Sequence, residues 1–192
     1  MACDLTRGRK DGCKDQVGGL KAIYFTDFGD LGTITYADAA NEDYQITDLS
    51  GTFEAFKYEL KGNSNFEQTI TANLENGTTF FEQSLNVTLK QLTKEDHKEL
   101  KLLSYGRPHI AVEDYNGNVF MMGVEHGAEL SGGTVATGAG MGDLSGYTLT
   151  FSAMERRPAN FLDLGATPDP ANATYPYNEM ASATPTVTAG TN

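Results

Sequence analysis

Apolar and polar residues alternate along much of the chain, as they do in β-strands that bury one face. Residues 77–92 and residues 147–158 both show this alternation over the length of a strand. Residues 20–28 differ, because apolar side chains occupy both sides of the alternation, which predicts a strand covered on both faces. The pattern therefore predicts a mainly β fold.

Residues 108–123 predict a short hairpin. Two alternating runs flank Asn116-Gly117, a dipeptide typical of a two-residue type I′ turn. A two-residue loop places Val112 opposite Met121. The register is a specific expectation, because a slip of one residue changes which side chains share a face.

Residues 52–74 predict a second and longer hairpin. A three-residue loop at residues 62–64 gathers the apolar side chains on one face, whereas a two-residue loop mixes the two faces. The three-residue loop also sets Glu59 directly opposite Glu67 on the polar face. Like charges at paired positions cost stability, so we expect this face to serve something other than folding.

One helix and one glycine-rich segment interrupt the strands. Thr93 is a suitable N-cap for a helix within residues 92–106, with Asp96 as its third residue and Gly106 as its end. Residues 125–146 contain many glycines, but they lack the lysine of a phosphate-binding loop and lead into a strand. A flexible or close-packed loop is therefore predicted there.

The composition divides the chain into three parts. Residues 1–19 form a charged N-terminal arm, and residues 20–158 form a β-sandwich or barrel-like domain with a single α-helix and a long hairpin. After Pro158 the composition shifts to Pro, Ala, Thr and Asn. We therefore expect residues 159–192 to be an extended arm or a disordered tail without a core of its own.

The chain is strongly acidic, with 26 Asp and Glu residues against 14 Lys and Arg residues and a net charge of -12. Residues 1–21 are net basic, so the negative charge is concentrated in the remainder. An acidic body argues against binding nucleic acid by counterion release. It fits simple solubility, or a surface past which nucleic acid slides. No apolar run is long enough to span a bilayer, and no signal peptide is expected.

The sequence has no arrangement typical of a catalytic or metal site. The three histidines lack the spacing of a zinc site, and neither G-x-S-x-G nor H-E-x-x-H occurs. Cys3 and Cys13 are expected to be free thiols in a reducing compartment, with a short disulfide loop as the alternative. We therefore predict no catalytic residue, no cofactor and no metal ligand.

The order of these features resembles that of the tail tube proteins, or major tail proteins, of long-tailed bacteriophages. The resemblance covers roughly residues 17–160. An early strand in "GGLKAIYFTDFGD" is followed by "GTFEAFKYELKGNSNFEQTITANLENGT", then by a strand and the single helix. The closing stretch "GDLSGYTLTFSAMERRPA" looks most like the family, with a glycine step, an alternating strand, an acid and a proline.

The resemblance implies a structural virion protein that is not an enzyme. Members of the family self-assemble into rings, usually homohexamers, whose strands form a continuous barrel. The rings stack into the viral tail tube through which the DNA genome is ejected into the host bacterium. The implied partners are further copies of the chain and other tail proteins such as sheath, terminator or baseplate, and DNA passes without specific binding. The implied location is the tail of the virion, after assembly in the host cytoplasm.

The resemblance implies candidate residues for assembly, either in the wall of the channel or in contacts between copies of the chain. An acidic channel wall repels a passing polyanion, which makes the polar face of residues 52–74 a candidate lumen face. The candidates there are Glu59, Glu67, Thr69 and Thr71. The candidates for contacts between subunits or rings lie in the two arms and are Arg7, Arg9, Lys10, Phe161, Tyr175 and Tyr177.

Two other classes of function are compatible with the same pattern. One is a capsid decoration protein or another β-sandwich binding module of a virion or surface, such as a carbohydrate-binding module. A carbohydrate site would require a cluster of exposed aromatic residues, and the chain contains no Trp. The other is an enzyme whose site is assembled from distant acids. Size in solution separates them, because a tube protein forms rings or polymers and the others stay small.

Overall fold

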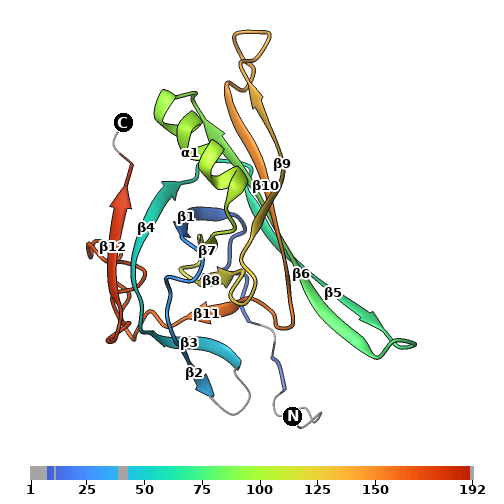
Figure 1. The fold of residues 1–192 in the computed structure, drawn as a ribbon, viewed down its shortest axis with the longest axis vertical. Coiled ribbons are helices and arrows are strands. Elements are labelled where there is room, and N and C mark those ends of the chain that lie inside the picture. Colours follow the sequence, from blue (N-terminus) through green and yellow to red (C-terminus); the bar gives the residue numbers. More distant parts are fainter. Residues whose placement is uncertain (1–7, 11, 39–42, 191–192) are drawn as a thin grey trace.

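The structure is a computed structural model that describes residues 8–10, 12–38 and 43–190. Within these residues the fold is mainly β, with two sheets and one helix, α1 (Lys94–Tyr105). Figure 1 shows α1 lying across the opening between the sheets. The predicted fold class, a mainly β domain with a single helix, is confirmed.

The larger sheet, sheet A, has eight strands and the smaller, sheet B, has four. In spatial order sheet A consists of β12 (Thr184–Ala189), β4 (Thr52–Glu59), β1 (Leu20–Thr26), β7 (His109–Asp114), β8 (Val119–Met122), β11 (Asn160–Leu162), β3 (Asp43–Leu49) and β2 (Ile34–Asp38). Sheet B consists of β5 (Asn65–Asn73), β6 (Thr78–Lys90), β10 (Gly146–Glu155) and β9 (Glu129–Ala136). All pairs in sheet B are antiparallel.

Two hydrophobic cores lie on opposite faces of sheet A. The inter-sheet core lies between the sheets and contains Ile23 and Phe25 of β1 together with Phe151 of β10. The C-terminal core lies on the other face and contains Ala22 and Tyr24 of β1. The prediction that residues 20–28 form a strand covered on both faces is therefore confirmed for Leu20–Thr26.

The predicted helix forms where its capping residues indicate. The Thr93 hydroxyl accepts a hydrogen bond from the Asp96 N–H at 3.0 Å, which satisfies one of the free donors at the start of the helix. The Gly106 N–H donates to the Leu102 carbonyl at the end. Leu100 and Leu103 pack against the inter-sheet core, so α1 closes one side of it.

The hairpin of residues 108–123 is present, but its register differs by one residue from the prediction. Val112 pairs with Phe120, and Met121 pairs with Ala111. The loop has three residues, and only Gly117 has a positive φ, of 82°. A type I′ turn needs a positive φ at two residues, and residues other than glycine rarely adopt it. The Asp114 carboxylate accepts the N–H groups of Asn116 and Asn118, which stabilises the longer loop.

The predicted hairpin of residues 52–74 is wrong. Strand β4 pairs with β1 and β12 in sheet A, whereas β5 pairs with β6 in sheet B. The chain crosses between the sheets at residues 60–64, where Leu60 enters the inter-sheet core and the Ser64 hydroxyl accepts the Thr88 N–H. Glu59 and Glu67 are therefore not opposed. The long hairpin of this protein is β5–β6.

The glycine-rich segment also differs in part from the prediction. Residues 129–136 form β9 at the edge of sheet B, and only the tip that follows is a loop. Gly133 pairs with Leu149, and a Cβ at Gly133 would lie 3.0 Å from a Leu149 methyl group. Gly133 thus allows close packing within the strand, which an alternation of apolar side chains does not reveal.

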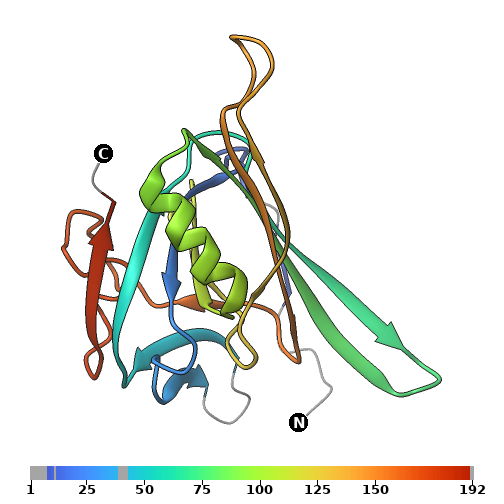
Figure 2. The same cartoon turned by 45° about the horizontal axis from the view of Figure 1, so that its top comes forward.

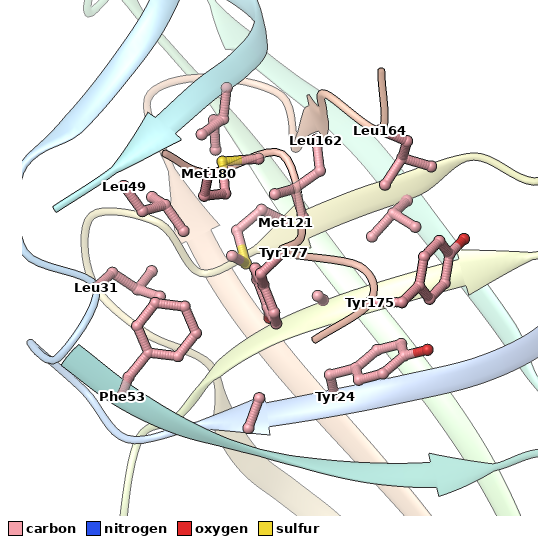
Figure 3. Packing of buried hydrophobic residues seen from close by; sticks show 14 of the residues in the cluster. Tyr24, Leu31, Leu49, Phe53, Met121, Leu162, Leu164, Tyr175, Tyr177 and Met180 are labelled. Atoms are coloured by element: carbon pink, nitrogen blue, oxygen red, sulfur yellow. The ribbon is translucent and has the colours of Figure 1, made fainter. Parts of the chain in front are cut away.

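Residues 163–190, the C-terminal segment, pack onto sheet A where a free arm or tail was expected. Tyr175, Tyr177 and Met180 are buried in the C-terminal core. Figure 3 shows Tyr177 beside Phe53 and Met121. The Tyr177 and Phe53 rings meet edge to face, with 5.0 Å between the ring centroids. Strand β12 then adds in parallel to β4 at the edge of the sheet.

We predict that the Tyr177→Ala substitution lowers the free energy of unfolding by about 3–5 kcal/mol, because it leaves a cavity in a core. Tyr177 is 1% exposed, whereas Tyr105 on α1 is 82% exposed and serves as the matched control. Tyr105→Ala should change the stability by less than about 0.5 kcal/mol. Urea unfolding measures both, and equal small effects would mean that the C-terminal segment does not cover sheet A.

Candidate functional site

The face of sheet B that points away from the inter-sheet core is polar and acidic. We call it the outer face of sheet B. The strand registers align its side chains in rows, for example Glu67, Ser84, Ser152 and Glu129. In the next row, the Thr150 hydroxyl donates to the Asn86 side chain at 2.8 Å. Because hydroxyl and amide groups dominate, this face suits contact with water.

The charges on the outer face of sheet B are mainly negative. Glu67, Glu82 and Glu129 occupy it, and Lys90 lies at its end beside Gly146. None of the three glutamates has an ion pair within the described part of the chain. Their charges therefore stay uncompensated at this surface.

Three of the four predicted lumen residues come together on this face. Glu67, Thr69 and Thr71 are alternate residues of β5, and all three are exposed. Glu59 lies elsewhere, at the end of β4 in sheet A, where it pairs with Lys57 at 3.5 Å. A hairpin of residues 52–74 would place Glu59 beside Glu67, but the crossing of the chain between the two sheets separates them.

The distal part of the β5–β6 hairpin, residues 69–82, projects beyond the body of the molecule (Figure 2). We call it the β5–β6 arm. Ile70 is 66% exposed and Leu74 at the tip is 98% exposed. Ile70 points to the same side of sheet B as the inter-sheet core, but it lies past the end of that core and nothing in the described chain covers it.

The predicted arm residues have different environments. Arg7 lies outside the described residues, whereas Arg9 and Lys10 are exposed. Phe161 is partly exposed, and the centroid of its ring lies 4.6 Å from that of Phe120. Tyr175 and Tyr177, in contrast, are buried in the C-terminal core, so their side chains serve the fold of their own chain.

A cleft of about 730 Å³ lies between the end of α1 and strands β1, β4 and β9. We call it the α1 cleft. Its apolar lining includes Phe25, Phe56 and Leu103, and its acidic lining residues are Asp27, Glu99 and Glu129. Burial, together with the nearby Asp96 and Glu99 carboxylates, raises the pKa of Tyr58 in the lining to about 12. The α1 cleft therefore combines apolar and aromatic surface with negative charge.

Buried Glu113 ties sheet A to the C-terminal segment, and sequence patterns missed it. Its carboxylate pairs with Lys21 and accepts hydrogen bonds from the hydroxyls of Tyr24 at 3.1 Å and Tyr175 at 3.3 Å. Figure 3 shows both tyrosine hydroxyls on the same side of the core. Burial, followed by the negative charge of Glu113, raises the pKa of both hydroxyls, so both remain proton donors. The network has a structural role.

Glu125, His126 and Glu155 have ligand atoms within 4.8 Å of one another. Two arginines already bind the Glu125 carboxylate, with Arg156 at 3.1 Å and Arg157 at 2.9 Å. The hydrogen bond from Arg156 is the largest cause of the lowered pKa of Glu125. A metal ion would have to displace these arginines, so the residues present fit an ion-pair cluster better than a metal site.

His109 is held as a neutral imidazole. Its Nδ1–H donates to the Gly123 carbonyl at 2.6 Å, and its Nε2 accepts the Gly29 N–H at 3.2 Å. Phe28 stacks on the ring, and the Arg107 guanidinium lies over Phe28 at 4.1 Å. Burial lowers the pKa of His109, more than the Gly123 carbonyl and nearby Asp30 raise it.

We predict that His109 makes the protein less stable in mild acid. Its pKa is lower in the folded than in the unfolded chain, so below about pH 6.5 the unfolded chain takes up a proton first. This contribution to stability is complete above that pH and is lost as the pH falls towards the folded pKa. Urea unfolding between about pH 7.5 and pH 5.5 should show a smaller loss for His109→Asn than for wild type. His97→Asn, at an exposed position of α1, should leave the loss unchanged.

Within the described chain, no helix is both long and apolar enough to cross a membrane. The geometry offers a polar acidic sheet face, a projecting arm and an acidic cleft. No protein-family model matches it, and no match to a curated protein is found.

Proposed function

We propose that the chain is a structural protein of a bacteriophage virion that self-assembles into stacked rings to form the tail tube. The resemblance in the order of its sequence features suggests the family. The observation that carries the proposal is the outer face of sheet B, a broad, polar and negatively charged sheet surface. The chain would act without catalysis or a cofactor.

The outer face of sheet B has the chemistry required of a channel wall for DNA. Its Ser, Thr and Asn side chains keep it hydrated, and Glu67, Glu82 and Glu129 give it negative charge. A negatively charged wall repels phosphate groups, so a passing duplex does not adhere. In a ring the same charges repeat around the lumen. The proposal thus keeps Glu67, Thr69 and Thr71 as lumen residues and leaves out Glu59.

The edges of sheet B support closure of such a ring. Strands β5 and β9 are the two edges, and each has one side unpaired within the described chain. Sheet B has four antiparallel strands, so β9 of one copy and β5 of the next run in opposite directions when placed side by side. Pairing these edges continues the antiparallel pattern into a barrel and removes edges that invite uncontrolled association.

The β5–β6 arm supports contacts beyond one subunit. Ile70 and Leu74 are exposed apolar residues on the β5–β6 arm, where residues 71–80 pair only with each other in the described chain. Clustered exposed apolar groups on a projecting element are characteristic of interaction surfaces. We propose that the arm packs on a neighbouring copy, in the same ring or the next. Sheath, terminator or baseplate proteins would bind elsewhere on the tube.

We predict that the purified protein forms rings or tubes visible by negative-stain microscopy. The paired substitutions Ile70→Lys and Leu74→Lys should abolish them and leave stability nearly unchanged, because both side chains are exposed. The conservative pair Ile70→Val and Leu74→Met keeps the apolar surface and should assemble normally. A wild-type protein that remains monomeric at high concentration in analytical ultracentrifugation would contradict the proposal and favour a small binding module.

A further inference from the structure

The basic N-terminal stretch, residues 8–19, has cations without partners. Arg9, Lys10 and Lys14 are exposed and form no ion pair with any residue that the structure describes. Asp11 and Asp15 lie in the same stretch, which leaves it a net charge of +1, whereas the chain as a whole has a net charge of -12. A complementary acidic surface is the natural partner for such a stretch.

The α1 cleft offers that complement. Asp27 lines it without an ion pair among the described residues, and Glu99 has only exposed Lys98 nearby at 3.9 Å. The Glu129 side chain belongs to the outer face of sheet B and points away from the cleft. Arg107, the cation of the lining, lies over the Phe28 ring. Phe56 and Tyr58 supply aromatic surface against which the stems of lysine and arginine side chains pack.

The basic N-terminal stretch and the α1 cleft lie at opposite ends of β1. Val17 is fixed at the start of this strand, because its N–H and carbonyl both bond to the Asn116 side chain. The cleft lies around the other end, where Phe25 and Asp27 line it, and the strand from Leu20 to Phe25 spans about 17 Å. From Val17 the chain reaches Lys14 within about 10 Å. Lys14 therefore cannot enter the cleft of its own chain. Arg9 and Lys10 lie farther from Val17, and docking of these two residues within one chain is separated from docking between copies by the experiment below.

We propose that the basic N-terminal stretch of one copy of the chain docks in the α1 cleft of a second copy. The lysine and arginine side chains pair with Asp27 and Glu99, and their aliphatic stems lie against the aromatic lining. Because the two surfaces lie at opposite ends of β1, the contact is head to tail and repeats from copy to copy. As the contact that stacks successive rings, it rests on the proposed function.

The docking is tested by disulfide trapping between two versions of the full chain, both with Cys3→Ser. One keeps Cys13, which is exposed in the basic N-terminal stretch. The other carries Cys13→Ser and Ser104→Cys, and Ser104 lines the α1 cleft. Each version carries only one of the two cysteines, so a disulfide between Cys13 and the cysteine at position 104 must join two copies. The matched control replaces Ser104→Cys by Ala181→Cys, at an exposed position of the C-terminal segment.

After mild oxidation, we expect a crosslinked dimer on a non-reducing gel with Ser104→Cys and at least about tenfold less with Ala181→Cys, a ratio that corresponds to about 1.4 kcal/mol. Reversing the charges of Arg9, Lys10 and Lys14 to Glu should remove the crosslink. Changing Asp27 and Glu99 to Lys in the receiving copy should restore it. This rescue depends on charge pairing and does not follow from a general loss of folding.

Equal yields of crosslinked dimer from the cleft and control positions would overturn the docking. A yield that stays the same after charge reversal would also overturn it. A chain with both Cys13 and Ser104→Cys that forms only an internal disulfide would also overturn it, in favour of docking within one chain. Tubes seen by microscopy without the crosslink would remove this contact and leave the proposed function intact. The charge-dependent crosslink in a protein that forms no rings or tubes would support the docking and contradict the proposed function.

Discussion

Sheet A is stable only if both of its faces are covered, and this constraint organises the molecule. The central strand β1 is apolar on both sides, and leaving either side in water would cost about 25 cal/mol for each Å² of apolar surface. Sheet B and α1 cover one face, and the C-terminal segment covers the other. Buried Glu113 fits the same scheme, because Tyr24 and Tyr175 bond to its carboxylate and so link the sheet to its cover.

The surfaces that remain free follow from that arrangement. Sheet B uses one face for the inter-sheet core, so its other face is left for water and is accordingly rich in Ser, Thr, Asn and Glu. The β5–β6 arm continues past the end of the core and keeps Ile70 and Leu74 exposed. In the ring that we propose, the outer face would form the channel wall and the arm would contact a neighbouring copy.

The sequence predicts the individual elements better than their partners. Local signals such as the Thr93 cap and the alternation in β6 and β10 identify α1 and these strands. Alternation alone cannot decide which strand lies beside which, so β4 and β5 were paired although they belong to different sheets. The outer face of sheet B was recognised in part through Glu67, but Glu82 and Glu129 joined it only through long-range pairing. The role of the C-terminal segment was hidden because a few aromatic residues in a Pro- and Ala-rich stretch suffice to cover a sheet.

The central claim is that the outer face of sheet B lines a channel built from repeated copies of this chain. Electron cryo-microscopy of the assembled protein, at a resolution that separates strands, tests it most directly. We expect sheet B to form the inner wall, with β9 of each copy beside β5 of the next and the Glu67 side chains directed into the lumen. A reconstruction in which sheet B lies on the outside of the assembly, or in which its outer face is buried between subunits, would contradict the account.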